Sequence, residues 1–278
     1  MAPPLSAPRA SDDCRRRSAD AAGHGETHPN PCTVAPLNSV VLFHTCLINE
    51  FFPDVGFAVV KVLERLGCSV DVPMGQTCCG QPAFNGGFAE EARVAARHTI
   101  EVLEPTDGPI VVPSGSCGDM LIHQFPALFV DHPEWQHRAR AVADRCVEFS
   151  AFTFPRVERL GRMQLRTTVA YHPSCHLARG LSIDREPRGL MNAIAGVETT
   201  PLVADDECCG FGGLFSIKHA DISTRMLERK LDHVDHAAPQ RMVSCDMGCL
   251  LHIGGGLQRR GSPITVQHLA QLLAEALE

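Results

Sequence analysis

A pair of adjacent cysteines followed by glycine occurs twice in this chain, as Cys78-Cys79-Gly80 and as Cys208-Cys209-Gly210. Adjacent cysteines do not readily bond to each other, because the small ring that results strains the peptide between them. Two neighbouring thiolates in a glycine-rich turn are better suited to hold one inorganic centre. A turn of this kind that occurs twice constrains both the fold and the chemistry.

The doubled turn belongs to a longer repeat. Corresponding cysteines lie 129, 130 and 132 residues apart, in the pairs Cys46 and Cys175, Cys78 and Cys208, and Cys117 and Cys249. Each cysteine follows a strand-like segment and precedes a helix-like one, so chance does not account for the near-constant offsets. We interpret the chain as an internal duplication of one structural unit.

Apolar runs alternate with helical periodicity along both copies. Runs typical of buried strands cover residues 40–44, 68–73, 110–112, 168–172, 197–203, 241–244 and 264–266. Helical patterns cover residues 54–66, 89–103, 135–149, 187–194 and 221–236, and a last helix runs through residue 277. This alternation predicts an α/β fold of two pseudo-symmetric repeats, each a small, mainly parallel sheet flanked by helices, with ligands at the carboxyl ends of the strands.

The repeat also divides the chain. Residues 1–37 are rich in Ala, Pro, Ser and Arg without apolar periodicity, which predicts a flexible extension. We expect the first repeat over residues 38–133, a linking helix region over 134–165 and the second repeat over 166–278.

Composition excludes several classes of function. The net charge of −7 and the lack of a basic stripe argue against nucleic-acid binding. No apolar run approaches the roughly 18 residues of a membrane helix. Thirteen cysteines, an odd number gathered in motifs, and no apolar leader at the start predict a cytoplasmic protein that uses thiolates for metal rather than disulfides.

The cysteines form two sets. The first is Cys46, Cys78, Cys79 and Cys117, and the second is Cys175, Cys208, Cys209, Cys245 and Cys249. Four or five thiolates from separate loops suit zinc or an iron–sulfur cluster, and their spacing does not distinguish the two. The close Cys-x-x-Cys pairs of zinc ribbons and the bacterial ferredoxin run are both absent from the sequence.

Several polar residues border these sets. His44, His172 and His176 lie near Cys46 and Cys175, and we favour packing or support of the ligands over direct ligation for all three. Asp246 lies between the last two cysteines, where its carboxylate could accept a hydrogen bond from a neighbouring amide or shape the entry of a substrate.

The chain resembles the duplicated cysteine-rich CCG-domain family. The runs that carry the resemblance are CCGQPAFNGG, VPSGSCGDM, YHPSCHLARGLSIDREPRGLM and CCGFGGLFSIKHADIS. The family includes the CCG-containing subunit of heterodisulfide reductase, the iron–sulfur subunits of glycolate and anaerobic glycerol-3-phosphate dehydrogenases, and the lactate utilization A proteins, which these runs resemble most. The resemblance extends from about Val40 to the C-terminus.

This resemblance implies an iron–sulfur electron-transfer subunit of a system that oxidises L-lactate, a 2-hydroxy acid, to pyruvate. The second cysteine set would bind a 4Fe–4S cluster, which in relatives with five cysteines can be of a non-cubane type, and the first set an iron–sulfur cluster or zinc. The implied partners are a ferredoxin-like iron–sulfur subunit and a third lactate-utilization protein, with a small 2-hydroxy acid as the substrate of the complex. No catalytic residue follows from the resemblance.

The chain departs from the family pattern in both cysteine sets, and it has Pro173 where the family commonly has an Asp after Tyr-His. Five-cysteine sets end in Cys-x-x-Cys, whereas three residues separate Cys245 from Cys249, and the first set has no fifth cysteine. Ligation by Cys245 and the centre held by the first set therefore stay open. Two other functions stay open as well: a heterodisulfide-reductase-like subunit that reduces a disulfide, and a zinc-stabilised scaffold without a redox role.

Overall fold

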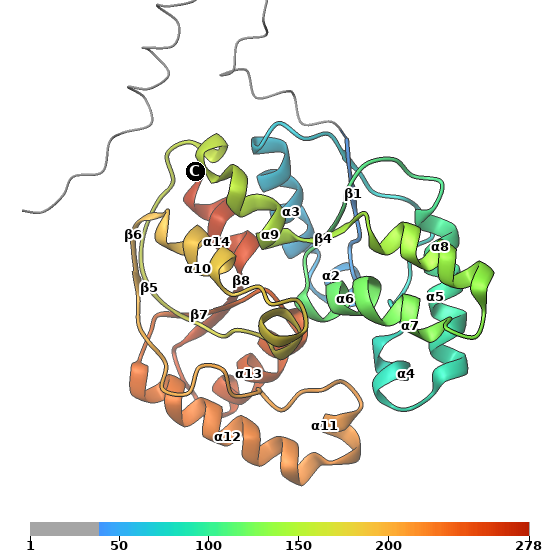
Figure 1. Cartoon of the computed structure of the whole chain (residues 1–278). Helices are drawn as coiled ribbons and strands as arrows, with labels where there is room; N and C mark the ends of the chain where they lie inside the picture. The colour runs from blue at the N-terminus through green and yellow to red at the C-terminus, as the bar shows by residue number, and fades with distance from the viewer. Residues whose placement is uncertain (1–38, 278) are drawn as a thin grey trace, which may run out of the picture. The chain divides into compact units, whose positions relative to one another are not determined.

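The protein contains two four-stranded parallel sheets, one from each half of the chain (Figure 1). The structure is a computed structural model that describes residues 39–277. The predicted extension, residues 1–37, lies outside the described residues. Within the described part, no helix is long and apolar enough to cross a membrane.

The two sheets have the same topology. The first has the spatial order β2-β1-β3-β4, with β1 at Val40–Leu42, β2 at Val70–Asp71, β3 at Ile110–Val112 and β4 at Cys146–Glu148. The second has the order β6-β5-β7-β8, with β5 at Gln164–Tyr171, β6 at Ala195–Thr199, β7 at Arg241–Ser244 and β8 at Thr265–His268. All neighbouring strands pair in parallel, which confirms the predicted α/β class and the duplication.

Helices connect and cover the strands. In the first half they are α2 (Cys46–Phe51), α3 (Pro53–Arg65), α4 (Gln81–Asn85), α5 (Ala89–Leu103), α6 (Gly115–Asp119), a π-helix at Met120–Gln124, α7 (Phe125–Leu128), α8 (Pro133–Ala143), α9 (Phe149–Thr153) and a 3₁₀ segment at Phe154–Leu160. In the second half they are a π-helix at His176–Gly180, α10 (Arg185–Asn192), α11 (Phe215–Lys218), α12 (Ala220–Ala237), α13 (Met247–Arg259) and α14 (Leu269–Ala276).

Local sequence explains the clearest elements. Strand β1 is apolar and buried along its whole length, as expected for a parallel strand covered on both faces. Helix α5 buries Ala92, Ala96 and Ile100 at helical spacing and leaves its glutamates exposed. Helix α3 begins with Pro53 in its first turn, where proline lacks no needed donor, and Gly67 beyond its end has a φ of 89°.

One predicted helix ends earlier than expected, and its last residues form a strand. The helix expected over residues 135–149 ends at Ala143, and Cys146–Glu148 forms strand β4 instead. This short segment pairs with β3, with Ile110 opposite Cys146 and Val112 opposite Glu148. Pairing at the edge of a sheet is a tertiary contact that overrides the local helical pattern.

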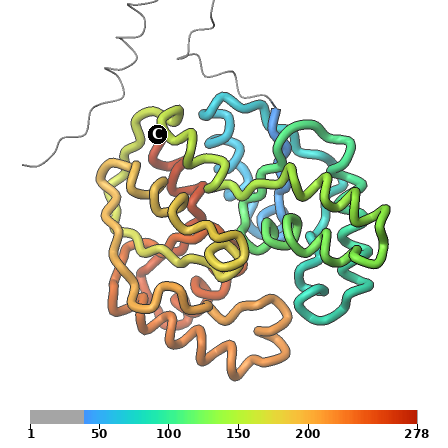
Figure 2. The backbone as a smooth tube through the Cα atoms, viewed as in Figure 1, coloured from blue at the N-terminus to red at the C-terminus, as the bar shows by residue number. Residues whose placement is uncertain are grey.

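The core joins the two repeats. One hydrophobic cluster contains Leu63 of α3, Val111 of β3, Tyr171 of β5 and Leu273 of α14. Helix α14 packs against α3, so the last helix of the chain lies beside one of the first, as Figure 2 traces. All described residues consequently belong to one compact unit.

Candidate metal site

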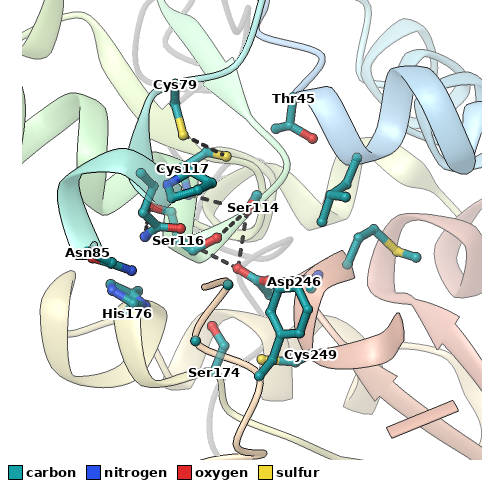
Figure 3. A pocket seen from close by; sticks show the side chains of 18 of the residues that line it. Thr45, Cys79, Asn85, Ser114, Ser116, Cys117, Ser174, His176, Asp246 and Cys249 are labelled. Atoms are coloured by element: carbon teal, nitrogen blue, oxygen red, sulfur yellow. Dashed lines mark hydrogen bonds between the residues drawn. The ribbon is translucent and has the colours of Figure 1, made fainter. Parts of the chain in front are cut away.

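Both cysteine sets line one shared cavity of about 190 Å³ (Figure 3). The cysteines that line it are Cys46, Cys78, Cys79, Cys117, Cys175, Cys208, Cys209 and Cys249. The sequence predicts one site in each repeat, and the structure brings the two sets to a common space. A cavity lined by sulfur from separate loops suits soft metal ions.

Four of these cysteines lie just after the carboxyl ends of strands. Cys46 begins α2 just after β1, and Cys117 lies in α6 just after β3. In the second repeat Cys175 follows β5, and Cys249 lies in the first turn of α13 after β7. The N-terminal end of a helix such as α13 stabilises negative charge on a thiolate.

The two Cys-Cys-Gly turns have the same conformation. Gly80 has a φ of 81° and Gly210 a φ of 91°, which side chains other than glycine rarely adopt. The N–H of Gly80 donates to the Sγ of Cys78 at 3.4 Å, and the N–H of Gly210 donates to the Sγ of Cys208 at 3.4 Å. Each turn thus directs an amide donor at its first cysteine.

Hydrogen bonds among the thiols favour charge on that same cysteine. A hydrogen bond from Cys46 lowers the pKa of Cys78, and one from Cys175 lowers the pKa of Cys208. The second cysteine of the first turn lies deeper, with the Sγ of Cys79 3.4 Å from that of Cys117. Thiolates are the form that binds metal, so these contacts favour the first cysteine of each turn as a ligand, while they raise the pKa of its partners Cys46 and Cys175.

Cys245 does not lie with the other cysteines. Its side chain is fully buried within a hydrophobic cluster, and its Sγ lies 3.9 Å from the hydroxyl oxygen of Tyr171. The next residue, Asp246, lines the cavity instead, and its Oδ1 accepts from the N–H of Gly248 as the N-cap of α13. The structure therefore brings eight of the nine predicted cysteines together and separates Cys245 from them.

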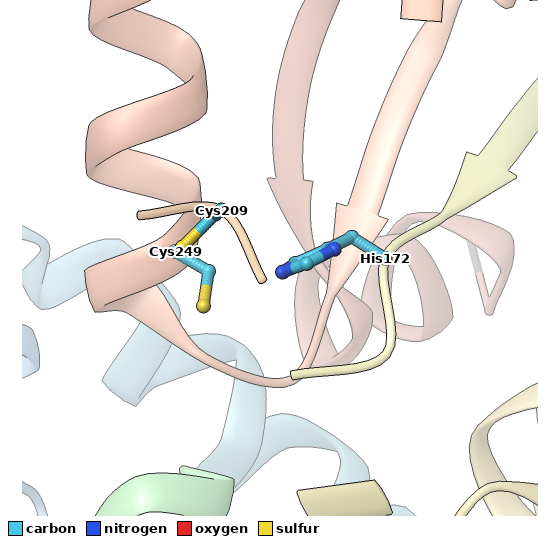
Figure 4. A group of neighbouring side chains, drawn as sticks. All are labelled: His172, Cys209 and Cys249. Atoms are coloured by element: carbon cyan, nitrogen blue, oxygen red, sulfur yellow. The ribbon is translucent and has the colours of Figure 1, made fainter. Parts of the chain in front are cut away.

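His172 lies behind the second set and does not line the cavity. It is fully buried, and its ring faces Cys209 and Cys249 (Figure 4). One ligand atom from each of these three residues lies within 4.8 Å of the others. His176 does line the cavity, and its Nε2 lies 4.0 Å from a carboxylate oxygen of Asp119.

Lys230 is a functional candidate that the sequence pattern does not indicate. It lies in α12 with no exposed surface, and its Nζ donates to the carbonyl oxygens of Ala204 and Asp205. Burial lowers its pKa, whereas Glu207, Asp205 and Cys209 raise it. A lysine inside a helical pattern is ordinarily exposed, so only its place among apolar positions such as Leu227 and Leu231 could have indicated its burial.

The residues present fit a metal ion or an iron–sulfur cluster. The cavity combines soft sulfur donors with glycine turns that direct amides at sulfur. Next to Cys209 and Cys249 lies the buried His172, whose ring nitrogens have no hydrogen-bond partner among residues 39–277. Such a donor set is typical of zinc and of iron–sulfur clusters.

The chain is similar to known proteins over most of its length. The cysteine-rich CCG domain matches it twice, over residues 40–122 and 169–254. A lactate utilization protein A from Geobacillus sp. (strain WCH70) is 43% identical over 237 residues, which cover 84% of this chain and 98% of that protein. Lactate utilization protein A 2 from Bacillus cereus (strain Q1) is 40% identical over 242 residues, which cover 86% of this chain and 98% of that protein.

A solved structure resembles the fold at low sequence identity. It belongs to a hypothetical protein from Helicobacter pylori, with a TM-score of 0.56 and 11% identity. The match covers 98% of this chain and 55% of that one, and it concerns the fold alone.

Proposed function

This chain belongs to the lactate utilization protein A family and carries the CCG cysteine-rich domain twice, and on that premise we propose that it serves lactate utilization as an iron–sulfur electron-transfer subunit. Its place is within a multi-protein system that oxidises L-lactate, a 2-hydroxy acid, to pyruvate. The observation that most supports the proposal is the single cavity lined by eight cysteines.

The proposal assigns the cysteines to two centres. The second centre, a 4Fe–4S cluster, would be held by Cys175, Cys208, Cys209 and Cys249, which all line the cavity. The first, an iron–sulfur cluster or zinc, would be held by Cys46, Cys78, Cys79 and Cys117. When bound, an iron–sulfur cluster supplies one-electron transfer at a potential that its surroundings tune.

The protein's own groups tune such a centre in ways that can be named. The N–H groups of Gly80 and Gly210 donate to sulfur, and hydrogen bonds to sulfur make a reduced, more negative centre easier to form. The buried ammonium of Lys230 acts in the same direction on the second set, since it lies close enough to Cys209 for their charges to interact. The buried Cys79 and Cys209 keep one side of each set away from water.

The first oxidation step is assigned to the complex and not to this subunit alone. A 2-hydroxy acid gives up two electrons together, usually as hydride to an organic cofactor. We propose that a ferredoxin-like iron–sulfur subunit and a third lactate-utilization protein act with this chain, which relays single electrons.

Anaerobic purification tests the metal chemistry. We expect a brown protein with iron and acid-labile sulfide, and an electron paramagnetic resonance signal on reduction. Cys208→Ser and Cys249→Ser should lose iron from the second site, whereas Cys68→Ala should keep it, because Cys68 packs in the hydrophobic core and does not line the cavity. A colourless protein loaded only with zinc would contradict the proposal.

Gene deletion tests the biological role. A deletion strain should fail to grow on L-lactate as the carbon source and should grow normally on pyruvate, the product of the step. Complementation with the wild-type gene should restore growth on lactate, and complementation with Cys208→Ser should not. Undiminished growth of the deletion strain on lactate would refute the assignment.

A further inference from the structure

We propose that His172 is a metal ligand of the second cysteine set, through a ring nitrogen, beside Cys209 and Cys249. The inference rests on the proposed function only in requiring that this set holds a metal ion or cluster. One ligand atom from each of the three residues lies within 4.8 Å of the others, and the imidazole faces both cysteines (Figure 4). The set thereby gains a nitrogen donor in addition to its sulfurs.

No hydrogen bond within residues 39–277 accounts for the buried imidazole of His172. His172 is 0% exposed, and neither Nδ1 nor Nε2 has a hydrogen-bond partner within the described part of the chain. A buried polar group without a partner costs free energy, on the order of 1–3 kcal/mol by protein mutational data. A metal bond to one nitrogen removes the cost at that nitrogen.

The duplication supplies an internal control for this position. Phe43 makes the backbone hydrogen bond of β1 to Val111, at 3.0 Å, and His172 makes the corresponding bond of β5 to Val243, at 2.8 Å. The two residues therefore hold the same place in the two repeats. Phe43 is equally buried, within one hydrophobic cluster with Cys79. The fold accepts a phenyl ring here, so packing alone does not explain a histidine.

Besides Phe43 and His172, the repeats differ at a second position, on the helix that contacts each Cys-Cys-Gly turn. A Cβ on Gly80 would meet Ala92 and Ala95, and one on Gly210 would meet Ser223 and Met226, so α5 and α12 correspond at an offset of 131 residues. At this offset Thr99 of α5 corresponds to Lys230 of α12.

The corresponding pairs are thus Phe43 and Thr99 in the first repeat and His172 and Lys230 in the second, all of them buried. The buried ammonium of Lys230 lies close enough to His172 for its charge to act on the imidazole. Nitrogen and positive charge are therefore concentrated at one of two otherwise similar cysteine sets.

This asymmetry predicts two different centres. At the place that His172 occupies in the second set, the first has the side chain of Phe43, which offers no ligand atom. A neutral imidazole donor adds no negative charge, and imidazole ligands raise the potential of an iron–sulfur centre relative to thiolates alone. The second centre should accept electrons at a higher potential than an all-thiolate centre of the same type.

Pulsed electron paramagnetic resonance on the full chain tests the ligand directly. The protein is prepared anaerobically with iron and sulfide, once with natural histidine and once with ¹⁵N-histidine, and reduced. We expect a nitrogen hyperfine coupling that changes with the isotope. His172→Phe should lose the coupling, and Phe is the residue that the first repeat uses at this place. His252→Phe should keep it, because His252 lies on α13 with its Nε2 3.3 Å from the Oγ of Ser223.

The outcomes separate this inference from the proposed function. Metal in the wild type without an isotope-sensitive nitrogen coupling overturns the histidine ligand alone, as does a coupling that survives in His172→Phe. A wild-type protein that takes up neither iron nor zinc overturns both. If the product contains only zinc, X-ray absorption at the zinc edge must show one nitrogen scatterer that His172→Phe loses. The labelled wild type decides the question even where His172→Phe does not fold.

Discussion

Ser114 donates a hydrogen bond to Asp246 across the junction of the two repeats, with 3.2 Å between the hydroxyl and carboxylate oxygens. Each residue is the N-cap of a helix that carries a cavity cysteine, α6 for Ser114 and α13 for Asp246. Ser114 stands three residues before Cys117, and Asp246 stands three residues before Cys249. Corresponding residues of the duplicated unit thus meet at the cavity and connect its two walls.

Removing the Asp246 carboxylate should lower the free energy of unfolding more than removing the Ser114 hydroxyl. Asp246 accepts from the N–H of Gly248 at 3.0 Å and from the N–H of Ser116 at 2.9 Å, so Asp246→Ala leaves both donors without this acceptor. We expect a loss of about 2–3 kcal/mol in the free energy of unfolding, and about 1 kcal/mol for Ser114→Ala. Urea titration of matched preparations measures both, and equal losses would contradict the bridging role of the carboxylate.

Cys245→Ala should leave the metal content unchanged. The Cys245 sulfur lies against the Tyr171 hydroxyl in the core and not in the cavity, so its removal should cost about 1 kcal/mol of stability through a small void. Cys249→Ala, four positions along, should lose metal. Iron analysis of both variants decides between a core residue and a fifth ligand, since a fifth ligand predicts loss of iron from Cys245→Ala.

Alanine should be tolerated worse at Gly210 than at Gly80. A Cβ on Gly210 would lie 2.7 Å from the carbonyl oxygen of Ser223, whereas on Gly80 the nearest atom is the Ala95 Cβ at 3.0 Å. Both substitutions also place alanine at a positive φ, which costs about 1–3 kcal/mol. Gly255→Ala is the control: the site is helical with open space, so it should stabilise by about 0.5–1 kcal/mol. Thermal unfolding of the three variants measures their order of stability.

Glu148 should make the protein less stable as pH rises. Burial raises its pKa to about 7, above the value of 4.5 for an exposed glutamate. The folded state therefore holds this proton more tightly, and its contribution to stability is lost as pH rises from 4.5 through 7. The change is about 3 kcal/mol. Glu148→Gln removes the titration, so the stability of the variant relative to the wild type should increase over this range. A constant difference between the two proteins would contradict the buried proton.

His268 should produce the opposite pH dependence. It lies opposite Ser244 in the second sheet, as Glu148 lies opposite Val112 in the first, and both residues cap the following helix. Burial lowers the pKa of His268 to about 4 from 6.5. Its contribution is present above pH 6.5 and is lost as pH falls toward 4, again by about 3 kcal/mol.

His268→Asn replaces the Nδ1 that accepts from the N–H of Ala270 with an amide oxygen, which can cap the helix without titrating. Its stability relative to the wild type should increase as pH falls, with a slope opposite in sign to that of Glu148→Gln. Denaturant unfolding at several pH values, with the metal content matched between proteins, compares the two slopes. Slopes of the same sign would show that the two caps do not titrate as their burial predicts.

Much of the fold could be predicted because its signals are local. The apolar run at β1 and the helical spacing of Ala92, Ala96 and Ile100 in α5 each depend on neighbours within a few positions. Strand β4 was missed because its formation depends on pairing with Ile110–Val112, which lies outside the local pattern.

The sequence by itself determined the duplication, the α/β class and which cysteines recur, because constant offsets and periodicity are properties of the linear chain. Only the tertiary structure decided that both sets face one cavity, that Asp246 faces it while Cys245 does not, and that His172 is buried against two sulfurs. Adjacent residues in extended backbone point to opposite sides, so a sulfur motif alone does not say which side chain reaches the ligand. The distance between segments some 130 residues apart is set by packing, which no single motif records.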